Sequence, residues 1–176
     1  MVDQSYEYVD RFDKYLLSDV EDYDSLKIYR FKDFDLGRMK ELIHFSEEAF
    51  GEKAADVFEV VFQIYYGNVF LLKESHKNNK ILGMAAFSRA WDKNKMAYLS
   101  DYAIAEEARG ESLGEKFLKI VLEDLKDQGF EQIRLTVDPD NEPAVSLYES
   151  LGFEKIEFVE DLYGEEEDRY IMELVL

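Results

Sequence analysis

The residues with the clearest chemical potential lie in residues 99–123, a stretch typical of a strand, a polar turn and the start of a helix. Small or polar residues occupy the turn and the first helical positions: Arg109, Gly110, Ser112 and Gly114. The first N–H groups of a helix have no partner within it, and the positive end of the helix dipole lies behind them. Such an arrangement attracts anions, most often phosphate. The stretch therefore predicts a phosphate site.

The spacing of the glycines excludes two common phosphate loops. Neither GxxxxGK[ST] nor GxGxxG occurs here, which argues against a nucleoside-triphosphate loop and a dinucleotide loop. The segment RGESLG (residues 109–114) instead resembles the pyrophosphate loop of the GNAT N-acetyltransferase superfamily. That loop has Arg or Gln, two residues, Gly, one residue, then Gly or Ala. Ser112 stands at the first Gly position, and Glu111 adds a negative charge beside the expected diphosphate.

A second segment strengthens the resemblance. Residues 138–158, DPDNEPAVSLYESLGFEKIEF, are similar to a later GNAT segment that has an Asn near a helix start, a Leu-Tyr pair and Leu-Gly-Phe. The two matches occur in the family's order and together cover roughly the last half of the chain. The chain is therefore identified as a suspected member of the superfamily.

The resemblance implies acetyl-CoA as co-substrate and no metal. The coenzyme diphosphate would contact backbone N–H groups from Gly110 to Gly114, while the pantetheine arm pairs with the strand that enters the loop. The Ser112 hydroxyl could donate to a phosphate or cap the helix, and the Arg109 side chain could pair with a phosphate or bridge to Glu106 or Glu107. The full set of implied coenzyme contacts is Tyr102, Ala103, Ile104, Arg109, Gly110, Glu111, Ser112, Leu113, Gly114, Asn141 and Tyr148.

Acetyl transfer to an amine requires two proton movements: the ammonium loses a proton before attack, and the departing thiolate gains one. Tyr148 matches the family's tyrosine, so the resemblance implies that it is the general acid. Its alternative role is packing beside Val145 and Leu151. Asp101, on the preceding strand, is the best candidate for the base. It could equally bind a cationic amine or face away from the site.

Two classes of function follow. The first is an N-acetyltransferase that moves the acetyl group directly to a primary amine, either of a cationic, polyamine-like small molecule or of a protein. The second is a non-catalytic acyl-CoA-binding or interaction module on the same fold, which the departures at Glu111 and Ser112 motivate. Acceptor choice would depend on the helical region of residues 36–66, and a homodimer is one option because dimers are common in the family.

Composition limits the other possibilities. With 176 residues, 47% of them hydrophobic, the chain is long enough for one substantial core and short for two domains. There is no Cys, which excludes thiol chemistry and fits a reducing cytoplasm, and two His make a histidine metal centre improbable. The net charge of -19 disfavours nucleic acid and anionic membranes as partners. We find no apolar run long enough for a membrane span.

Hydropathy patterns predict a mixed central sheet of about seven strands with helices on both faces, the acyl-CoA N-acyltransferase fold that the resemblance implies. An acidic, aromatic extension (residues 1–25), with apolar residues at roughly helical spacing, precedes the acetyltransferase-like domain (residues 26–176). The helix over residues 53–66 is expected to be well buried, with core aromatics. The expected order is β-α-α-β-β-β-α-β-α-β-β, in which three antiparallel strands (68–74, 80–89, 95–104) precede a parallel pair.

Spacing predicts several local features. The first strand of the domain is expected over residues 26–31, and Asp140 or Asn141 is expected to cap the helix that ends at Gly152. The strand over residues 131–137 alternates, and the acidic run of residues 165–168 is expected to be solvated. The helix that ends at Gly129 has one apolar stripe: Leu113, Phe117, Leu118, Val121, Leu122 and Leu125.

Overall fold

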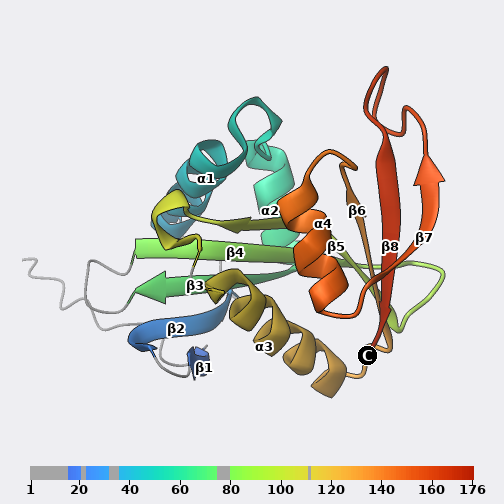
Figure 1. Cartoon of the computed structure of the whole chain (residues 1–176). Helices are drawn as coiled ribbons and strands as arrows, with labels where there is room; N and C mark the ends of the chain where they lie inside the picture. The colour runs from blue at the N-terminus through green and yellow to red at the C-terminus, as the bar shows by residue number, and fades with distance from the viewer. Residues whose placement is uncertain (1–15, 21–22, 32–35, 75–79, 111) are drawn as a thin grey trace, which may run out of the picture.

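A single twisted sheet runs through the molecule, and four helices cover its faces (Figure 1). The computed structural model describes residues 16–20, 23–31, 36–74, 80–110 and 112–176. The strands are β1 (Leu16–Val20), β2 (Tyr23–Phe31), β3 (Asn68–Glu74), β4 (Lys80–Arg89), β5 (Met96–Ile104), β6 (Gln132–Val137), β7 (Glu154–Val159) and β8 (Arg169–Val175). The helices are α1 (Leu36–Phe50), α2 (Val57–Tyr66), α3 (Leu113–Asp127) and α4 (Glu142–Ser150), with 3₁₀ turns η2 (Gly51–Lys53) and η3 (Glu106–Ala108).

The strand order is β1-β2-β3-β4-β5-β6-β8-β7. Every neighbouring pair is antiparallel except β5 and β6, which are parallel and connected through α3. A parallel pair needs a crossover connection, and a helix is the usual one. The predicted mixed sheet with helices on both faces is confirmed, with eight strands among the described residues rather than about seven.

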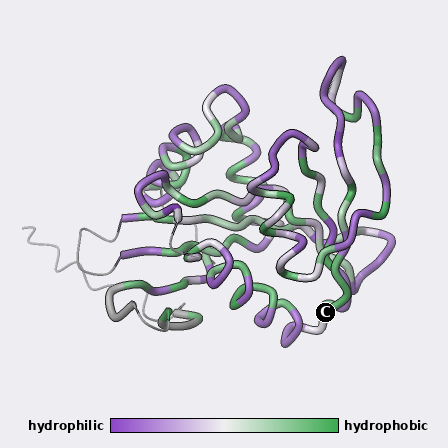
Figure 2. Tube along the Cα trace, in the orientation of Figure 1, coloured by the Kyte–Doolittle hydropathy of each residue, from purple (hydrophilic) through white to green (hydrophobic). Residues whose placement is uncertain are grey.

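Two hydrophobic cores lie on opposite faces of the sheet. Helices α1 and α2 cover one face, where the core includes Leu42, Val60 and Met84. Helices α3 and α4 cover the other face, where the core includes Phe117 and Leu135. Hydrophilic segments gather in loops such as the β7–β8 connection, and the central strands are largely hydrophobic (Figure 2). No helix in the described part of the chain is both long and apolar enough to cross a membrane.

Helix α3 has the clearest amphipathic pattern, and the structure confirms it. The predicted apolar residues are all buried: Leu113, Phe117, Leu118, Val121, Leu122 and Leu125. Gly129 follows the helix with φ +89°, a left-handed conformation that glycine adopts at low cost. The next strand, β6, alternates as predicted, with Ile133, Leu135 and Val137 buried.

Two parts of the prediction are wrong. Residues 16–20 form a strand that was not predicted, and β2 begins at Tyr23 rather than at residue 26. Residues 1–15, in which most of the extension falls, lie outside the described residues. Helix α2 begins at Val57, and its buried residues are Val60, Gln63 and Ile64. The wide apolar arc expected to be buried is largely on the surface.

Candidate active site

The site begins where β5 and β6 separate. Their parallel pairing covers only Met96–Leu99 opposite Gln132–Leu135. On the other side of β5, Asp101 pairs with Ala86 while Leu99 pairs with Phe87, so one extra residue forms a bulge between them. A bulge bends a strand and increases its twist. The second half of β5 therefore lies along an open cleft of about 650 Å³.

The free edge of β5 faces this cleft. The Ala105 N–H donates to Leu82 O in β4 at 2.8 Å, and backbone groups alternate sides along a strand. The N–H and C=O groups of Tyr102 and Ile104 consequently point away from β4. An edge of this kind can pair with an extended amide-containing arm.

Arg109 turns back onto β5 instead of bridging to Glu106 or Glu107. Its Nε donates to the Ile104 carbonyl oxygen at 3.0 Å, so the side chain turns back onto the end of β5. Glu107 is instead paired with Lys80. Arg109 still lines the cleft. Its hydrogen bond occupies one acceptor on the free edge, the Ile104 carbonyl oxygen. The backbone N–H and C=O groups of Tyr102 stay available to a ligand.

The turn before α3 has two residues with positive φ: Gly110 at +92° and Ser112 at 55°. Ser112 is the N-cap of α3, but its side chain makes no capping hydrogen bond, so the predicted cap is absent. The left-handed conformation gives a physical reason for the family's glycine at this position. Leu113 is 4% exposed, so only its backbone is available to a ligand. Glu111 lies outside the described residues.

Gly114 brings the first turn of α3 against β5. A Cβ atom there would lie 2.9 Å from the Tyr102 hydroxyl oxygen and 3.3 Å from Ile104 Cγ1. Real Cβ atoms do not approach other atoms so closely without displacing them. The absence of a side chain therefore sets the distance between the helix start and the free strand edge.

Tyr148 reaches the same cleft from α4, whose start is capped as predicted: Asn141 Oδ1 accepts from the Ala144 N–H at 3.2 Å. Tyr148 is 7% exposed, and its ring packs on Phe153 and Tyr102. The side chain is therefore packed and also lines the cleft, and its role as general acid stays a prediction. Burial raises the Tyr148 pKa well above that of a free tyrosine, so the hydroxyl keeps its proton.

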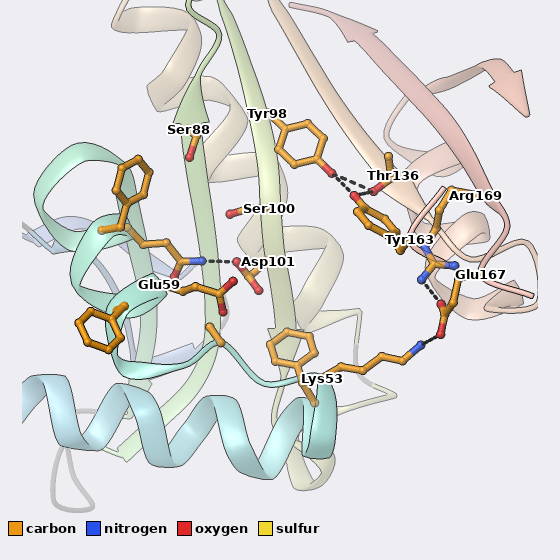
Figure 3. Close-up of a pocket in the computed structure, with 15 residues that line it drawn as sticks. Lys53, Glu59, Ser88, Tyr98, Ser100, Asp101, Thr136, Tyr163, Glu167 and Arg169 are labelled. Carbon is orange, nitrogen blue, oxygen red and sulfur yellow. Dashed lines mark hydrogen bonds and ion pairs between the residues drawn. The ribbon is translucent and has the colours of Figure 1, made fainter. Parts of the chain in front are cut away.

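Asp101 opens onto a second and larger cavity, of about 970 Å³, between α2, β5 and the β7–β8 loop (Figure 3). The Gln63 side-chain amide donates to its Oδ2. Burial, with a smaller contribution from Glu59, raises the Asp101 pKa, while the hydrogen bonds from Ser100 and Gln63 oppose the rise. Asp101 therefore does not face away from the site.

The two cavities meet at this point. They share Phe50, Lys53, Ser100, Asp101, Thr136 and Arg169. The 650 Å³ cleft contains Tyr148, and the 970 Å³ cavity contains Glu59 and the aromatic rings of Phe58 and Phe62. A group bound in either cavity can therefore reach the Asp101 carboxyl group.

The far wall of the larger cavity comes from the β7–β8 loop. Lys53 Nζ lies 2.6 Å from Glu167 Oε1 and links the turn after α1 to this loop (Figure 3). Glu167 also pairs with Arg169, so part of the acidic run expected to be solvated is engaged. Above them, the Tyr98 hydroxyl lies 2.8 Å from Thr136 Oγ1 and 3.2 Å from the Tyr163 hydroxyl.

The aromatic side chains of α2 are exposed, contrary to the prediction. Phe58 is 84% exposed, Phe62 56%, Tyr65 59% and Tyr66 76%. The Phe62 and Tyr66 rings lie 5.3 Å apart, one helical turn from each other. Phe58 and Phe62 line the larger cavity, whereas Tyr65 and Tyr66 line a separate pocket, and none of the four belongs to the core.

The predicted site residues that the structure describes thus fall into two groups, and Glu111 lies outside the described residues. Seven of them line the 650 Å³ cleft: Asp101, Tyr102, Ala103, Ile104, Arg109, Asn141 and Tyr148. Gly110, Ser112, Leu113 and Gly114 form the turn and first helical residues beside it. Sequence reasoning missed Gln63, Lys53 and Glu167; the one available signal was a single glutamine within the apolar segment of α2.

Comparisons with known proteins identify the class. Residues 38–153 match the model of the Acetyltransferase (GNAT) family, which is more than half of the chain. The chain therefore belongs to the GNAT acetyltransferase family. Its fold is similar to that of the ribosomal-protein-S18-alanine N-acetyltransferase from Escherichia coli, with TM-score 0.71, 21% identity, and coverage of 85% of this chain and 93% of that one.

A structure of the NatC complex bound to Gag peptide and CoA is similarly close in fold, with TM-score 0.72, 15% identity, and coverage of 85% and 98%. Among curated proteins, a thialysine N-epsilon-acetyltransferase from Bos taurus is 39% identical over 40% of this chain and 41% of its own length. An N-alpha-acetyltransferase from Saccharolobus solfataricus is 32% identical over 44% of this chain and 47% of its own length. The matches thus span less than half of these two relatives.

Proposed function

We propose that the protein transfers the acetyl group of acetyl-CoA directly to a primary amine. One observation carries the proposal: Asp101 lies where two cavities meet, and Tyr148 lines the one that runs along the free edge of β5. A two-substrate transfer needs a donor site, an acceptor site and a shared point for the reacting atoms. The geometry supports this arrangement.

The donor site would hold the coenzyme between β5 and α4. The free backbone groups of Tyr102 suit the amides of a pantetheine arm. The N–H groups at the start of α3 suit a diphosphate, and Gly114 lets this end of the helix lie close to β5. When bound, the coenzyme supplies an activated thioester. A metal has no role in this proposal.

The acceptor site would be the larger cavity. The negative groups that line it are Asp101 at the junction, Glu59, and Glu167, which is already paired with Lys53 and Arg169. This balance favours an acceptor that arrives as a cation, such as a protonated primary amine. The proposal covers an amine of a small molecule and an amino group of a protein.

Two side chains would move the protons. Asp101 takes a proton from the bound amine, and its raised pKa makes it a stronger base than an exposed aspartate. Tyr148 gives its hydroxyl proton to the departing sulfur. The chain lacks Cys, which agrees with direct transfer.

A release assay tests the proposal. Acetyl-CoA is mixed with the protein and with spermidine, lysine or a peptide with a free N-terminus, and free CoA thiol is measured together with the mass of the product. We expect amine-dependent thiol release and an acetylated amine, with much slower release by Asp101→Asn.

A non-catalytic coenzyme-binding module is the second candidate, and the strained Ser112 in the loop is the observation that favours it. Calorimetry with acetyl-CoA separates the two. Tight binding without release in the presence of any amine supports the module, whereas absence of binding contradicts both functions.

A further inference from the structure

Gln63 is a polar residue on the inward face of α2. It lies between Val60 and Ile64 in the buried set of that helix and is 8% exposed. Its Nε2 donates to Asp101 Oδ2, which joins α2 to β5 across 38 positions of sequence. Gln63 also lines the 970 Å³ cavity.

The oxygen atom of the Gln63 amide is placed unfavourably. Its Oε1 is buried and has no hydrogen-bond partner in the structure. Leaving a buried carbonyl unpaired destabilises a fold, and an apolar side chain of similar size would avoid the loss. The other buried residues of α2, Val60 and Ile64, are apolar, so Gln63 is the exception on this face.

The chemistry of the partner explains the orientation of the amide. An ionised carboxylate only accepts hydrogen bonds, so the amide must turn its N–H group toward Asp101 and its oxygen away. The resulting hydrogen bond to a charged group is among the stronger kinds. It also fixes the direction of the Asp101 carboxyl group at the junction of the two cavities.

We propose that Gln63 is a positioning residue for acetyl transfer: it holds the Asp101 carboxylate in place and in its ionised form, ready to take the proton of the incoming amine. The inference rests on the proposed function and names a residue of that same site.

The surroundings of Asp101 set the direction of the expected pH effect. The charged and titratable groups that line the larger cavity with it are Glu59, Lys53, Tyr98, Glu167 and Arg169. Those that line the 650 Å³ cleft with it are Lys53, Tyr102, Arg109, Asp138, Tyr148 and Arg169. Burial and Glu59 raise its pKa, whereas the hydrogen bonds from Gln63 and Ser100 lower it. Loss of the Gln63 N–H therefore raises the Asp101 pKa further.

The test is the pH profile of kcat/KM for Gln63→Met with acetyl-CoA and the best primary amine of the panel. We expect kcat/KM at neutral pH to fall about tenfold or more, as for loss of a hydrogen bond to a charged group. The acidic limb of the kcat/KM profile, where the rate rises as Asp101 ionises, should move to higher pH. The Tm should change little, because the unpaired Oε1 and the hydrogen bond to Asp101 are lost together, and the Kd for CoA should not change.

Val60→Ala is the matched control, because Val60 lies on the same buried face of α2 and is fully buried. It should lower the Tm and leave the acidic limb in place. Gln63→Asn, whose amide is too short to reach Asp101, provides a second variant with the same expected limb shift.

Three outcomes overturn the inference. An unchanged profile in both Gln63 variants contradicts it while the proposed function stands. Slower turnover with an unmoved limb and a lowered Tm, as in the control, shows a merely structural role. Absence of turnover by the wild-type protein contradicts the proposed function and this inference together.

Discussion

The Tyr102 hydroxyl donates to the Gly114 carbonyl oxygen across 2.6 Å, which ties the middle of β5 to the first turn of α3. Tyr102 is also stacked on Phe117 of the same helix, with ring centroids 6.1 Å apart. The free edge of β5 and the N–H groups at the helix start are thereby held in a fixed relation. We infer that this contact presets the distance between a coenzyme's pantetheine and diphosphate sites.

Gly114→Ala should disturb that relation. The new Cβ would meet the Tyr102 hydroxyl at 2.9 Å, so the helix start must move. We expect a loss of about 1–3 kcal/mol in unfolding free energy, as for other overpacked sites, and a clearly weaker Kd for CoA. Denaturant unfolding and calorimetry measure the two effects.

Gly129→Ala is the matched control at the other end of α3. Gly129 has φ +89° and nothing within 4 Å of its Cβ position, so alanine there is strained without a clash. It should lower stability and leave CoA binding intact. Equal CoA affinities for Gly114→Ala and the wild type would contradict the role given to this contact.

Ser112→Gly should stabilise the protein. Ser112 has φ 55°, a left-handed conformation that costs an L-residue about 1 kcal/mol or more and costs glycine little. Part of the gain is lost to the greater freedom of glycine in the unfolded chain. We expect an increase of up to about 1 kcal/mol in unfolding free energy, with CoA bound as well as before.

Ser112→Ala provides the comparison. The serine side chain makes no capping hydrogen bond, so its removal should change stability by less than about 0.5 kcal/mol. A loss of the size typical of a missing N-cap, about 1 kcal/mol, would show that the hydroxyl caps α3 after all.

Tyr148→Phe should slow the chemical step. The variant keeps the packing on Phe153 and Tyr102 but has no proton to give to the sulfur. We expect kcat to fall about a hundredfold, with the Kd for CoA within a factor of two or so of the wild-type value. Tyr170→Phe, on β8 and outside both cavities, should retain the wild-type rate. An unchanged kcat in Tyr148→Phe would remove the acid role.

The rate should depend on pH through Asp101. A base must be ionised, so kcat/KM should rise as pH increases through the Asp101 pKa, and burial places that limb above the usual aspartate range. Asp101→Asn should lower the rate and remove the limb. A profile that keeps the same limb in the asparagine variant would assign the titration to another group, such as the amine itself.

Sequence patterns predicted those parts of the fold that depend on residues close together in the chain. The α3 stripe from Leu113 to Leu125, the alternation of β6 and the Asn141 cap are each set by spacing within one element. The loop and Tyr148 were found because a family pattern covers consecutive residues. In each case, the residues that specify the feature lie within one helix, one strand or one short motif.

The remaining features depend on contacts between distant residues. Gln63 meets Asp101 across 38 positions, and Lys53 meets Glu167 across 114, so no local spacing records either contact. The exposure of Phe58 and Tyr66 could not be predicted because helical periodicity marks an apolar arc without showing which part faces the sheet. The point where β5 and β6 separate depends likewise on sheet twist and the bulge before Asp101.

A crystal structure of the protein with CoA tests the central claim most directly. We predict the diphosphate on the backbone N–H groups between Gly110 and Gly114, the pantetheine along β5 at Tyr102, and the sulfur within hydrogen-bond reach of the Tyr148 hydroxyl. Coenzyme bound elsewhere would contradict the two-cavity site on which the account rests. So would a coenzyme sulfur that is separated from Asp101 by β6.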